Sequence, residues 1–175
     1  MATTRIMPLH VGKGRTESRA ISDIIDYVAN PKKTDNGRLI TGYACDSRIA
    51  DAEFLLAKRQ YIATTGRVRG TDDVIAYHVR QSFRPGEITP EEANRLGVEF
   101  AKRFTKGNHA FVVCTHIDKS HIDNHIIWSP CLLYTSVFYR PPGNGAGQTG
   151  AGKHCSWYGL HREPYRGTGA FRPAA

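Results

Sequence analysis

The sequence predicts an α+β fold, in which helices pack on one face of a central, largely antiparallel sheet. Strand-like and helix-like segments are mixed along the 175 residues, a length that suits one globular domain. Residues 110–116 and 121–128 read as two strands with only a short turn between them. Because a parallel pair needs a crossover of about a dozen residues, these two strands are expected to be antiparallel.

The first part of the chain is predicted to form a strand, a helix and a second, short strand. Residues 4–11 are strand-like, and Pro8 favours an edge position because proline has no amide N–H to donate to a neighbouring strand. Residues 18–29 predict a helix, which an Asn-Pro pair ends. Its apolar residues at helical spacing are Ile21, Ile24, Ile25 and Val28. An Asp-Asn-Gly turn at 35–37 leads into an extended segment at 39–44.

Two further helices and another strand are predicted before the final pair of strands. Residues 47–64 present a broad apolar face at helical spacing. Residues 73–83 are rich in β-branched and aromatic side chains, which is typical of a strand. Thr89 is expected to cap a helix that begins with Pro90 and runs to Thr105, since proline suits the first helical position.

The composition narrows the class of protein. No apolar run approaches the ~20 residues that a membrane span needs, and no secretory signal precedes the first strand, so a cytoplasmic protein is expected. The four cysteines form no CxxC pair, which argues against a zinc knuckle and a disulfide scaffold. The net charge of +8 indicates a polyanionic partner, with nucleic acid as the first candidate.

The chain is predicted to divide at residue 129. Residues 1–128 have globular patterning, whereas residues 129–175 hold 8 of the 17 glycines and 5 of the 9 prolines. Such a composition favours turns and disorder, and we expect this tail to be disordered or foreign to the domain. Gly147–Lys153 resembles the start of a phosphate-binding loop. His154 follows it where serine or threonine would hold Mg²⁺, so we interpret the match as chance.

Histidines and aspartates gather in the segment 115–129, with the sequence THIDKSHIDNHIIWS. They are His116, Asp118, His121, Asp123 and His125. In a strand, side chains two residues apart point to the same face, so those at 121, 123 and 125 are expected to share one. The other two are expected to be able to reach that face across the turn. Imidazole nitrogen together with carboxylate oxygen predicts a site for Mn²⁺, Mg²⁺ or a late transition metal.

Three segments together resemble the motifs of the conjugative relaxases, the mobilisation nucleases of bacterial plasmids and conjugative transposons. HIDKSHIDNHIIWS, from residue 116, resembles the family's third motif, HxDxxHxHNHxxxN. SFRPGE at 82–87 resembles the second motif, and ISDIIDYVANPKKT at 21–34 resembles the first, with its tyrosine at Tyr27. The resemblance covers about residues 3–128 and stops abruptly after Trp128.

The resemblance implies a DNA-nicking enzyme of the bacterial cytoplasm with the relaxase fold. Tyr27 would attack a phosphodiester at a transfer origin, become joined to the 5′ phosphate and leave a free 3′ hydroxyl. The implied partners are single-stranded or locally melted DNA and mobilisation accessory proteins. An unperturbed tyrosine, with a pKa near ~10, is a poor nucleophile at neutral pH and needs a base or a metal ion beside it.

The site residues follow from the resemblance and from the cluster. The expected ligands of a divalent ion, Mg²⁺ or Mn²⁺, are His116, Asp123 and His125, and the ion would polarise the scissile phosphate. Asp118 is expected to orient a histidine or to accept the tyrosine proton, and His121 to do either. The expected phosphate-binding residues are Arg67, Arg69, Arg80 and Arg84. The rival tyrosines are Tyr43, Tyr61 and Tyr77.

Two positions depart from the family pattern, and three other functions stay open. The family has histidine where this chain has Asp123 and asparagine where it has Ser129. An aspartate still suits a hard cation but adds negative charge. The alternatives are a rolling-circle replication initiator of the related class, a relaxase fragment that binds DNA without cutting it, and an unrelated metal hydrolase, which would leave no protein joined to its DNA product.

Overall fold

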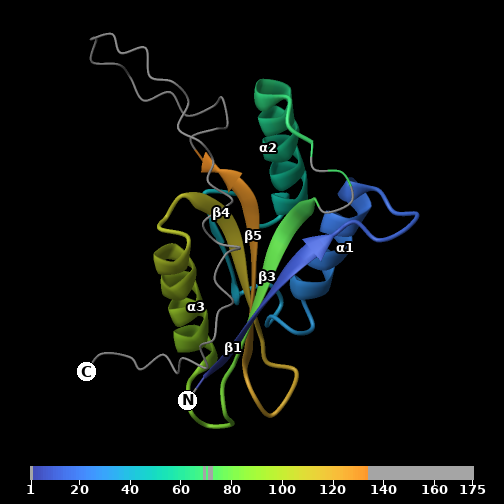
Figure 1. Ribbon diagram of the computed structural model, residues 1–175. Helices are drawn as coiled ribbons and strands as arrows, with labels where there is room; N and C mark the ends of the chain where they lie inside the picture. The colour runs from blue at the N-terminus through green and yellow to red at the C-terminus, as the bar shows by residue number, and fades with distance from the viewer. Residues whose placement is uncertain (1, 69, 71–72, 134–175) are drawn as a thin grey trace, which may run out of the picture.

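The computed structural model describes residues 2–68, 70 and 73–133. Within them, five strands form one antiparallel sheet in the order β1-β3-β5-β4-β2 (Figure 1). The strands are β1 (Thr3–His10), β2 (Ile40–Tyr43), β3 (Val74–Ser82), β4 (His109–His116) and β5 (Asp123–Leu132). The helices are α1 (Glu17–Val28), α2 (Ala50–Thr65) and α3 (Pro90–Phe104). The predicted α+β class is confirmed.

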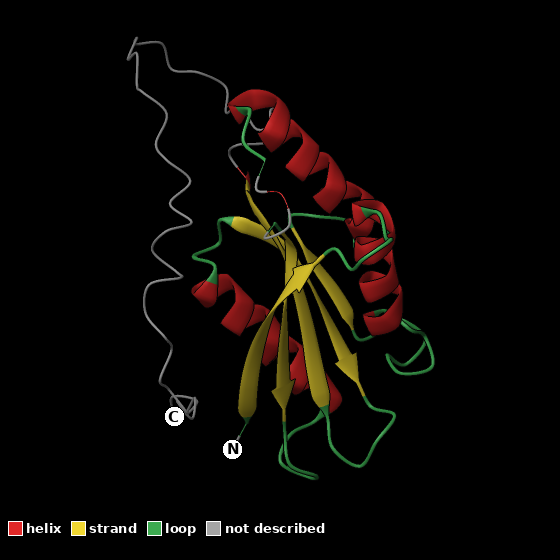
Figure 2. Cartoon of the chain, turned by 45° about the vertical axis from the view of Figure 1, so that its right-hand side comes forward, coloured by secondary structure: helices red, strands yellow, loops and turns green. Residues whose placement is uncertain are grey.

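The helices cover both faces of the sheet, so the expectation that they share one face is wrong (Figure 2). The core between the sheet and α1 and α2 includes Ile21, Val28 and Phe54 from the helices and Val112 and Ile127 from the strands. A second core lies beneath α3, on the opposite face. Its members include Ala101, Phe111, Val113, Ile126 and Trp128. Because neighbouring strand residues alternate between the two cores, both faces of the central strands are apolar and both need a helical cover.

The central strand β5 carries the candidate site at its start. It pairs with β3 on one side and β4 on the other, and its residues from Asp123 to Cys131 are buried. The strand begins two residues later than expected and runs to Leu132, beyond the predicted boundary at residue 128. Pro8 lies in the edge strand β1, as expected. Residues 134–175, with the loop-like run Gly147–Lys153, lie outside the described residues.

Local signals determine where α1 and α3 begin. Thr16 caps α1 by accepting a hydrogen bond from the backbone N–H of Arg19 at 3.2 Å. Thr89 and Glu92 form a reciprocal capping box at the start of α3, with Pro90 in its first turn. The buried residues of α1 are Ile21, Ile25 and Val28. This spacing orients α1 on the sheet and leaves Tyr27, in its last turn, 52% exposed.

A buried polar network connects α3 to the sheet behind the candidate site. The side chain of Asn124 accepts a hydrogen bond from the Thr115 hydroxyl at 2.7 Å and donates to the Ala93 carbonyl at 2.6 Å and to Gln81 at 3.2 Å. Asn124 itself is fully buried. Since adjacent strand residues point to opposite faces, anchoring Asn124 beneath α3 directs Asp123 and His125 toward α1.

We expect Gly97→Ala to destabilise the fold by a net ~1 kcal/mol, because overpacking a core typically costs about 1–3 kcal/mol. A Cβ at Gly97 would lie 2.7 Å from the Asn124 amide nitrogen and 2.9 Å from a Val113 methyl group. The gain in helix propensity from glycine to alanine, ~1 kcal/mol, is smaller than this steric cost. Urea unfolding measures the difference, with Arg95→Ala on the exposed side of α3 as the control. A Gly97→Ala protein more stable than wild type would contradict the packing described.

Among the described residues, none of the helices combines the length and the apolar character that crossing a bilayer requires.

Candidate active site

Three strands bring a cluster of buried histidines to the face of the sheet that α1 covers. His116 ends β4 and pairs with Asp123 at the start of β5. His125 lies opposite Cys114 of β4 and Arg80 of β3. His116 and His125 are each 5% exposed, Asp123 is 8% exposed, and the two imidazole centroids lie 4.2 Å apart. The structure therefore brings together the three expected metal ligands, two of them on β5.

His116 is anchored by the end of α1. Its Nε2 lies 2.8 Å from the carbonyl oxygen of Val28, the residue next to Tyr27. A carbonyl only accepts hydrogen bonds, so Nε2 carries the proton and Nδ1 of the neutral ring carries the lone pair. Histidines that bind metal ions in proteins commonly donate their other N–H to a carbonyl in this way.

His78 of β3 completes the cluster and was not predicted from the sequence. Its Nε2 lies 2.9 Å from Nδ1 of His125, the ring centroids are 5.1 Å apart, and the side chain is 7% exposed. The period-2 pattern of the strand places His78 on the same face as Arg80. That signal was available in the sequence, but the pairing of β3 with β5 was not.

Among the tyrosines of the described residues, Tyr27 is the one that lies beside this cluster. Its ring meets His116 and His125 edge-on, with centroids 6.1 and 6.0 Å away. The rivals lie elsewhere among the described residues. Tyr43 stacks on Phe111 and Tyr77 on Trp128, both within the core beneath α3. Tyr61 lies in α2.

Lys33 also lies at the cluster and was missed by the sequence analysis. Its Nζ is 4.4 Å from the centroid of the Tyr27 ring. The Lys33 carbonyl accepts a hydrogen bond of 2.9 Å from the N–H of Ile117, which ties the segment after α1 to the end of β4. The ammonium group of Lys33, a half-buried residue, thereby lies next to Tyr27 and His116.

His121 and the two aspartates, Asp123 and Asp118, differ in where they lie relative to β5. His121 precedes β5, so the expectation that it lies on the strand with Asp123 and His125 is wrong. Its Nε2 still lies 3.2 Å from Oδ2 of Asp123. The other carboxylate oxygen, Oδ1, is buried and has no hydrogen-bond partner among the described residues. Asp118 is exposed in the turn between β4 and β5.

Burial keeps the histidines uncharged. The pKa of His125 is lowered to about 3 and that of His78 to about 4, chiefly because burial disfavours the charged ring and to a lesser extent because of the neighbouring imidazoles and Arg80. Burial also lowers the pKa of His116, against the opposing effect of its hydrogen bond to Val28. The rings are therefore neutral near pH 7, the state in which imidazole binds metal ions.

These pKa shifts predict a pH-dependent stability for the metal-free protein. Unfolded histidine has a pKa of about 6.5, so below this pH the unfolded chain binds more protons than the folded one. The free energy of unfolding is expected to fall as the pH is lowered from about 6.5 to about 4, by up to ~1.4 kcal/mol per pH unit for each of His78 and His125. Urea unfolding in EDTA measures this slope. In His78→Gln the free energy of unfolding should depend less steeply on pH than in wild type. Equal slopes for the two proteins would contradict the lowered pKa of His78.

The cluster fits a divalent cation by its donor chemistry. Neutral imidazoles and a buried carboxylate oxygen without a partner are the groups that such an ion would satisfy. Their arrangement is not that of a formed metal centre. Among the described residues, no group of three or more His, Cys, Asp or Glu side chains is placed to hold a metal ion.

Of the four predicted phosphate-binding arginines, Arg80 is placed beside the cluster. It is exposed, lies opposite His125 in the β3–β5 register, and its charge lowers the pKa of both His78 and His125. Arg67 and Arg84 are exposed in the loops after α2 and β3. Arg69 lies outside the described residues.

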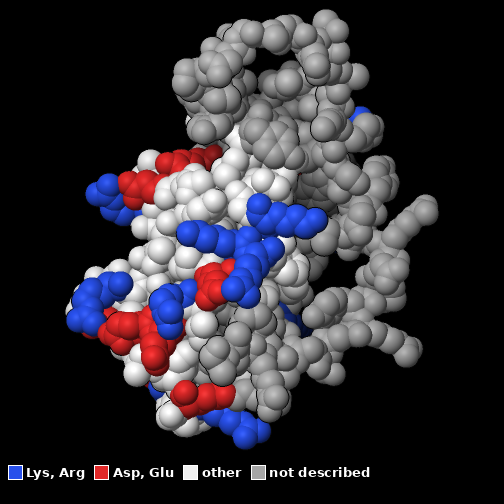
Figure 3. Space-filling model, turned by 90° about the vertical axis from the view of Figure 1, so that its left-hand side faces the viewer, with Lys and Arg blue, Asp and Glu red and all other residues white. Residues whose placement is uncertain are grey.

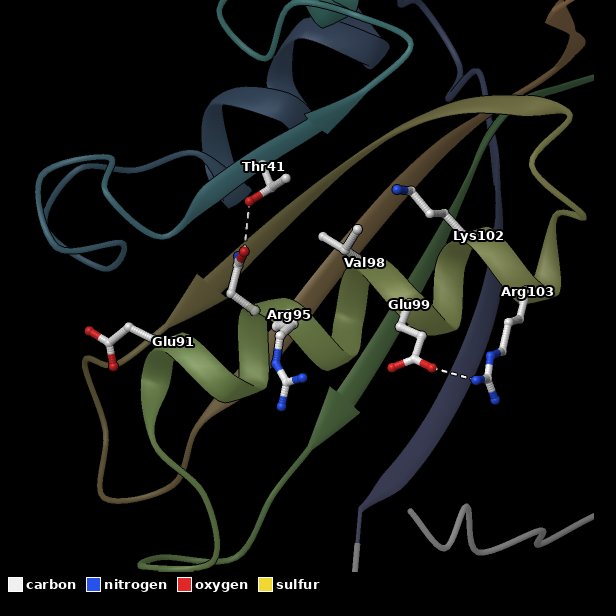
Figure 4. Close-up of a pocket in the computed structure, with 8 residues that line it drawn as sticks. Thr41, Glu91, Arg95, Val98, Glu99, Lys102 and Arg103 are labelled. Carbon is white, nitrogen blue, oxygen red and sulfur yellow. Dashed lines mark hydrogen bonds and ion pairs between the residues drawn. The ribbon is translucent and has the colours of Figure 1, made fainter. Parts of the chain in front are cut away.

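A hollow of about 470 Å³ lies on the other side of the sheet, between α3 and β2 (Figure 4). Its lining residues are Thr41, Glu91, Asn94, Arg95, Val98, Glu99, Lys102 and Arg103. None of them belongs to the histidine cluster. Acidic and basic side chains are interspersed on the described part of the face shown in Figure 3. That face therefore presents no field of a single sign to steer a polyanion.

Comparison with known proteins identifies the family. The model of the MobA/VirD2-like nuclease domain of relaxases matches residues 27–141, from Tyr27 through the second motif and the histidine cluster. The match continues past Trp128, so the expectation that the resemblance ends there is wrong. The group II intron-interrupted relaxase LtrB of Lactococcus lactis subsp. cremoris (strain MG1363) is 32% identical in a match covering 66% of this chain and 24% of that protein.

A second relative is protein rlx of Staphylococcus aureus, which is 35% identical over 80% of this chain and 38% of its own length. The chain thus spans between about a quarter and two fifths of the length of these relatives. The family model covers well over half of the chain and includes all the residues of the histidine cluster. The chain therefore belongs to the relaxase family, through its MobA/VirD2-like nuclease domain.

Proposed function

We propose that this chain nicks one strand of DNA at a transfer origin, with Tyr27 as the nucleophile. The observation that carries the proposal is the position of Tyr27. Its ring stands edge-on to His116 and His125, at the exposed mouth of a buried histidine cluster, in a chain of the relaxase family. A tyrosine of this kind is both accessible to a DNA strand and adjacent to groups that handle protons and cations.

The reaction is a transesterification. The phenolic oxygen of Tyr27 forms a bond to phosphorus while the bond from phosphorus to the 3′ oxygen breaks, which leaves the 5′ phosphate on the tyrosine. The phenolic proton passes to a base, for which Asp118 and His121 are the candidates, and the departing 3′ oxygen takes up a proton. The number of phosphoester bonds is unchanged, so the strand can be resealed by the reverse reaction.

A divalent cation, Mg²⁺ or Mn²⁺, fits the donors of the cluster. His116, Asp123 and His125 would hold it, and Asp123 in place of a histidine favours a hard cation. When bound, the ion would polarise the scissile phosphate and offset negative charge in the transition state. The hydrogen bond of His116 to the Val28 carbonyl would orient its ring for this task.

Positively charged side chains near Tyr27 would bind the DNA backbone. Lys33 and Arg80 lie beside the cluster, and Arg67, Arg69 and Arg84 would bind further phosphates. The substrate is single-stranded or locally melted DNA, and mobilisation accessory proteins in the bacterial cytoplasm are the expected partners.

We expect Lys33→Met to weaken binding of single-stranded DNA about tenfold, since a charge-assisted hydrogen bond contributes about 1.5–3 kcal/mol. The dependence of log K on log salt should also become shallower by about 0.7, the share of one phosphate contact on a single strand. Fluorescence anisotropy between low and moderate salt measures both quantities. Lys106→Met, at the opposite end of β4, is the matched control. Equal slopes for the two variants would show that Lys33 does not contact the DNA.

The test of the proposed function is a nicking assay with the wild-type chain. Labelled single-stranded DNA from the transfer origin of the source element is incubated with Mg²⁺ or Mn²⁺, and parallel samples contain EDTA. A protein–DNA adduct that survives denaturation, together with a free 3′ hydroxyl, is the expected product. Cleavage without an adduct would indicate a metal hydrolase, and binding without cleavage would indicate a relaxase domain that has lost its chemistry.

A further inference from the structure

His78 is a buried imidazole for which the proposed reaction has no role. It lies in β3, in the strand next to the third motif, and forms a hydrogen bond to His125. We propose that His78 accepts this bond from Nδ1–H of His125, and so holds His125 in the tautomer whose Nε2 carries the lone pair. His78 is then a positioning residue, and its consequence for metal binding rests on the proposed function.

The bond between the two rings has a direction. Nε2 of His78 and Nδ1 of His125 are 2.9 Å apart, which is hydrogen-bond distance. Between two neutral imidazoles one nitrogen donates and the other accepts. If His125 donates from Nδ1, its Nε2 is unprotonated and can bind a cation. If His78 donates instead, Nε2 of His125 carries a proton and cannot bind one.

The neighbouring groups fit the first direction when a cation is bound. His116 already donates from one nitrogen to the Val28 carbonyl and keeps the lone pair on the other. Asp123 contributes a buried oxygen that lacks a hydrogen-bond donor among the described residues. With His125 in the proposed tautomer, the cluster presents two nitrogen lone pairs and one carboxylate oxygen, a set of acceptors that a cation satisfies.

Burial makes His78 suitable for this role. The side chain is 7% exposed, and its backbone is paired on both sides, with β1 and with β5. The sheet therefore fixes the backbone of His78 beside β5, and the buried ring lies within hydrogen-bond distance of His125. An exposed histidine would exchange such a bond for water and would fix neither the tautomer nor the ring orientation.

The first experiment reads the tautomer without any metal ion. Protein labelled with ¹⁵N at histidine is studied by long-range ¹H–¹⁵N correlation NMR at pH 7 in EDTA. We expect His125 to show a protonated Nδ1 and an unprotonated Nε2. His78→Gln, which keeps an acceptor, should preserve this pattern, whereas His78→Leu should shift His125 toward the Nε2–H tautomer. A wild-type spectrum with Nε2 of His125 protonated would overturn the proposal, even if His78→Leu does not fold.

The second experiment measures the affinity for Mn²⁺ by isothermal titration calorimetry. Loss of such an orienting partner typically weakens metal binding about 10–100-fold, so His78→Leu should bind Mn²⁺ that much more weakly than wild type, with His78→Gln in between. Equal affinities would overturn the positioning role while leaving the proposed nicking intact. A wild-type chain with the expected tautomer but no affinity for Mn²⁺ would support the His78–His125 bond and count against the metal in the proposed function.

Discussion

Tyr27→Phe is expected to abolish the covalent protein–DNA adduct, reducing its rate of formation by at least about 10⁴-fold, as losses of essential nucleophiles do. The substitution removes the phenolic oxygen that would bond to phosphorus. It keeps the aromatic ring, so the edge contacts with His116 and His125 and the contact with Lys33 can persist. Affinity for single-stranded DNA should therefore change by no more than about fivefold, since one hydrogen bond contributes about 1 kcal/mol.

The control for this experiment is Tyr43→Phe. Tyr43 stacks on Phe111 beneath α3, and its hydroxyl lies 3.3 Å from the Gly107 carbonyl. Removing this hydroxyl should lower the stability of the fold slightly and leave adduct formation unchanged. Adduct formation is followed by denaturing gel electrophoresis with labelled DNA. An adduct that persists in Tyr27→Phe and disappears in Tyr43→Phe would place the nucleophile on the other face of the sheet.

His125→Ala is expected to eliminate both metal binding and adduct formation. His125 is the ring that contacts His78, His116 and Tyr27, so its removal takes away an expected ligand and the neighbour of the nucleophile. In wild type, an ion at 100 times its dissociation constant should stabilise the fold by about 2.7 kcal/mol, which appears as a rise in Tm. The variant should show no such rise and an adduct yield reduced by about 10²-fold or more, the scale of lost electrostatic stabilisation.

His109→Ala is the matched control for that prediction. His109 is a half-buried histidine at the opposite end of β4, bonded to the carbonyl of Ser129 at 2.9 Å and remote from the cluster. Its removal should leave the Mn²⁺-induced rise in Tm unchanged. A rise that disappears in His109→Ala but persists in His125→Ala would show that the cation binds elsewhere.

Much of the local structure could be predicted because its causes lie within a few residues. The spacing of Ile21, Ile25 and Val28 predicted α1 to within one residue at each end. Thr89 and Pro90 located the start of α3, and the short connection between β4 and β5 predicted their antiparallel pairing. The motifs also indicated the family, whose model matches residues 27–141.

The errors arose where one segment meets another that is distant along the chain. The histidine spacing predicted one strand through 121, 123 and 125, but pairing with β3 and β4 begins at Asp123 and leaves His121 outside. Both α1 and α3 are amphipathic, so the spacing of their apolar residues does not specify which face of the sheet each helix covers. That choice depends on the connections, which place α3 on the opposite face.

The sequence by itself determined the fold class, the family, and Tyr27, His116, Asp123 and His125 as the candidate site. Only the tertiary structure decided that Tyr27 meets the histidines while Tyr43 and Tyr77 lie on the other face, and that His78 and Lys33 join the cluster. The physical reason is that periodicity along a strand specifies which residues share a face, whereas strand order and register specify which faces meet. Register is set by packing over the whole sheet, so no local pattern contains it.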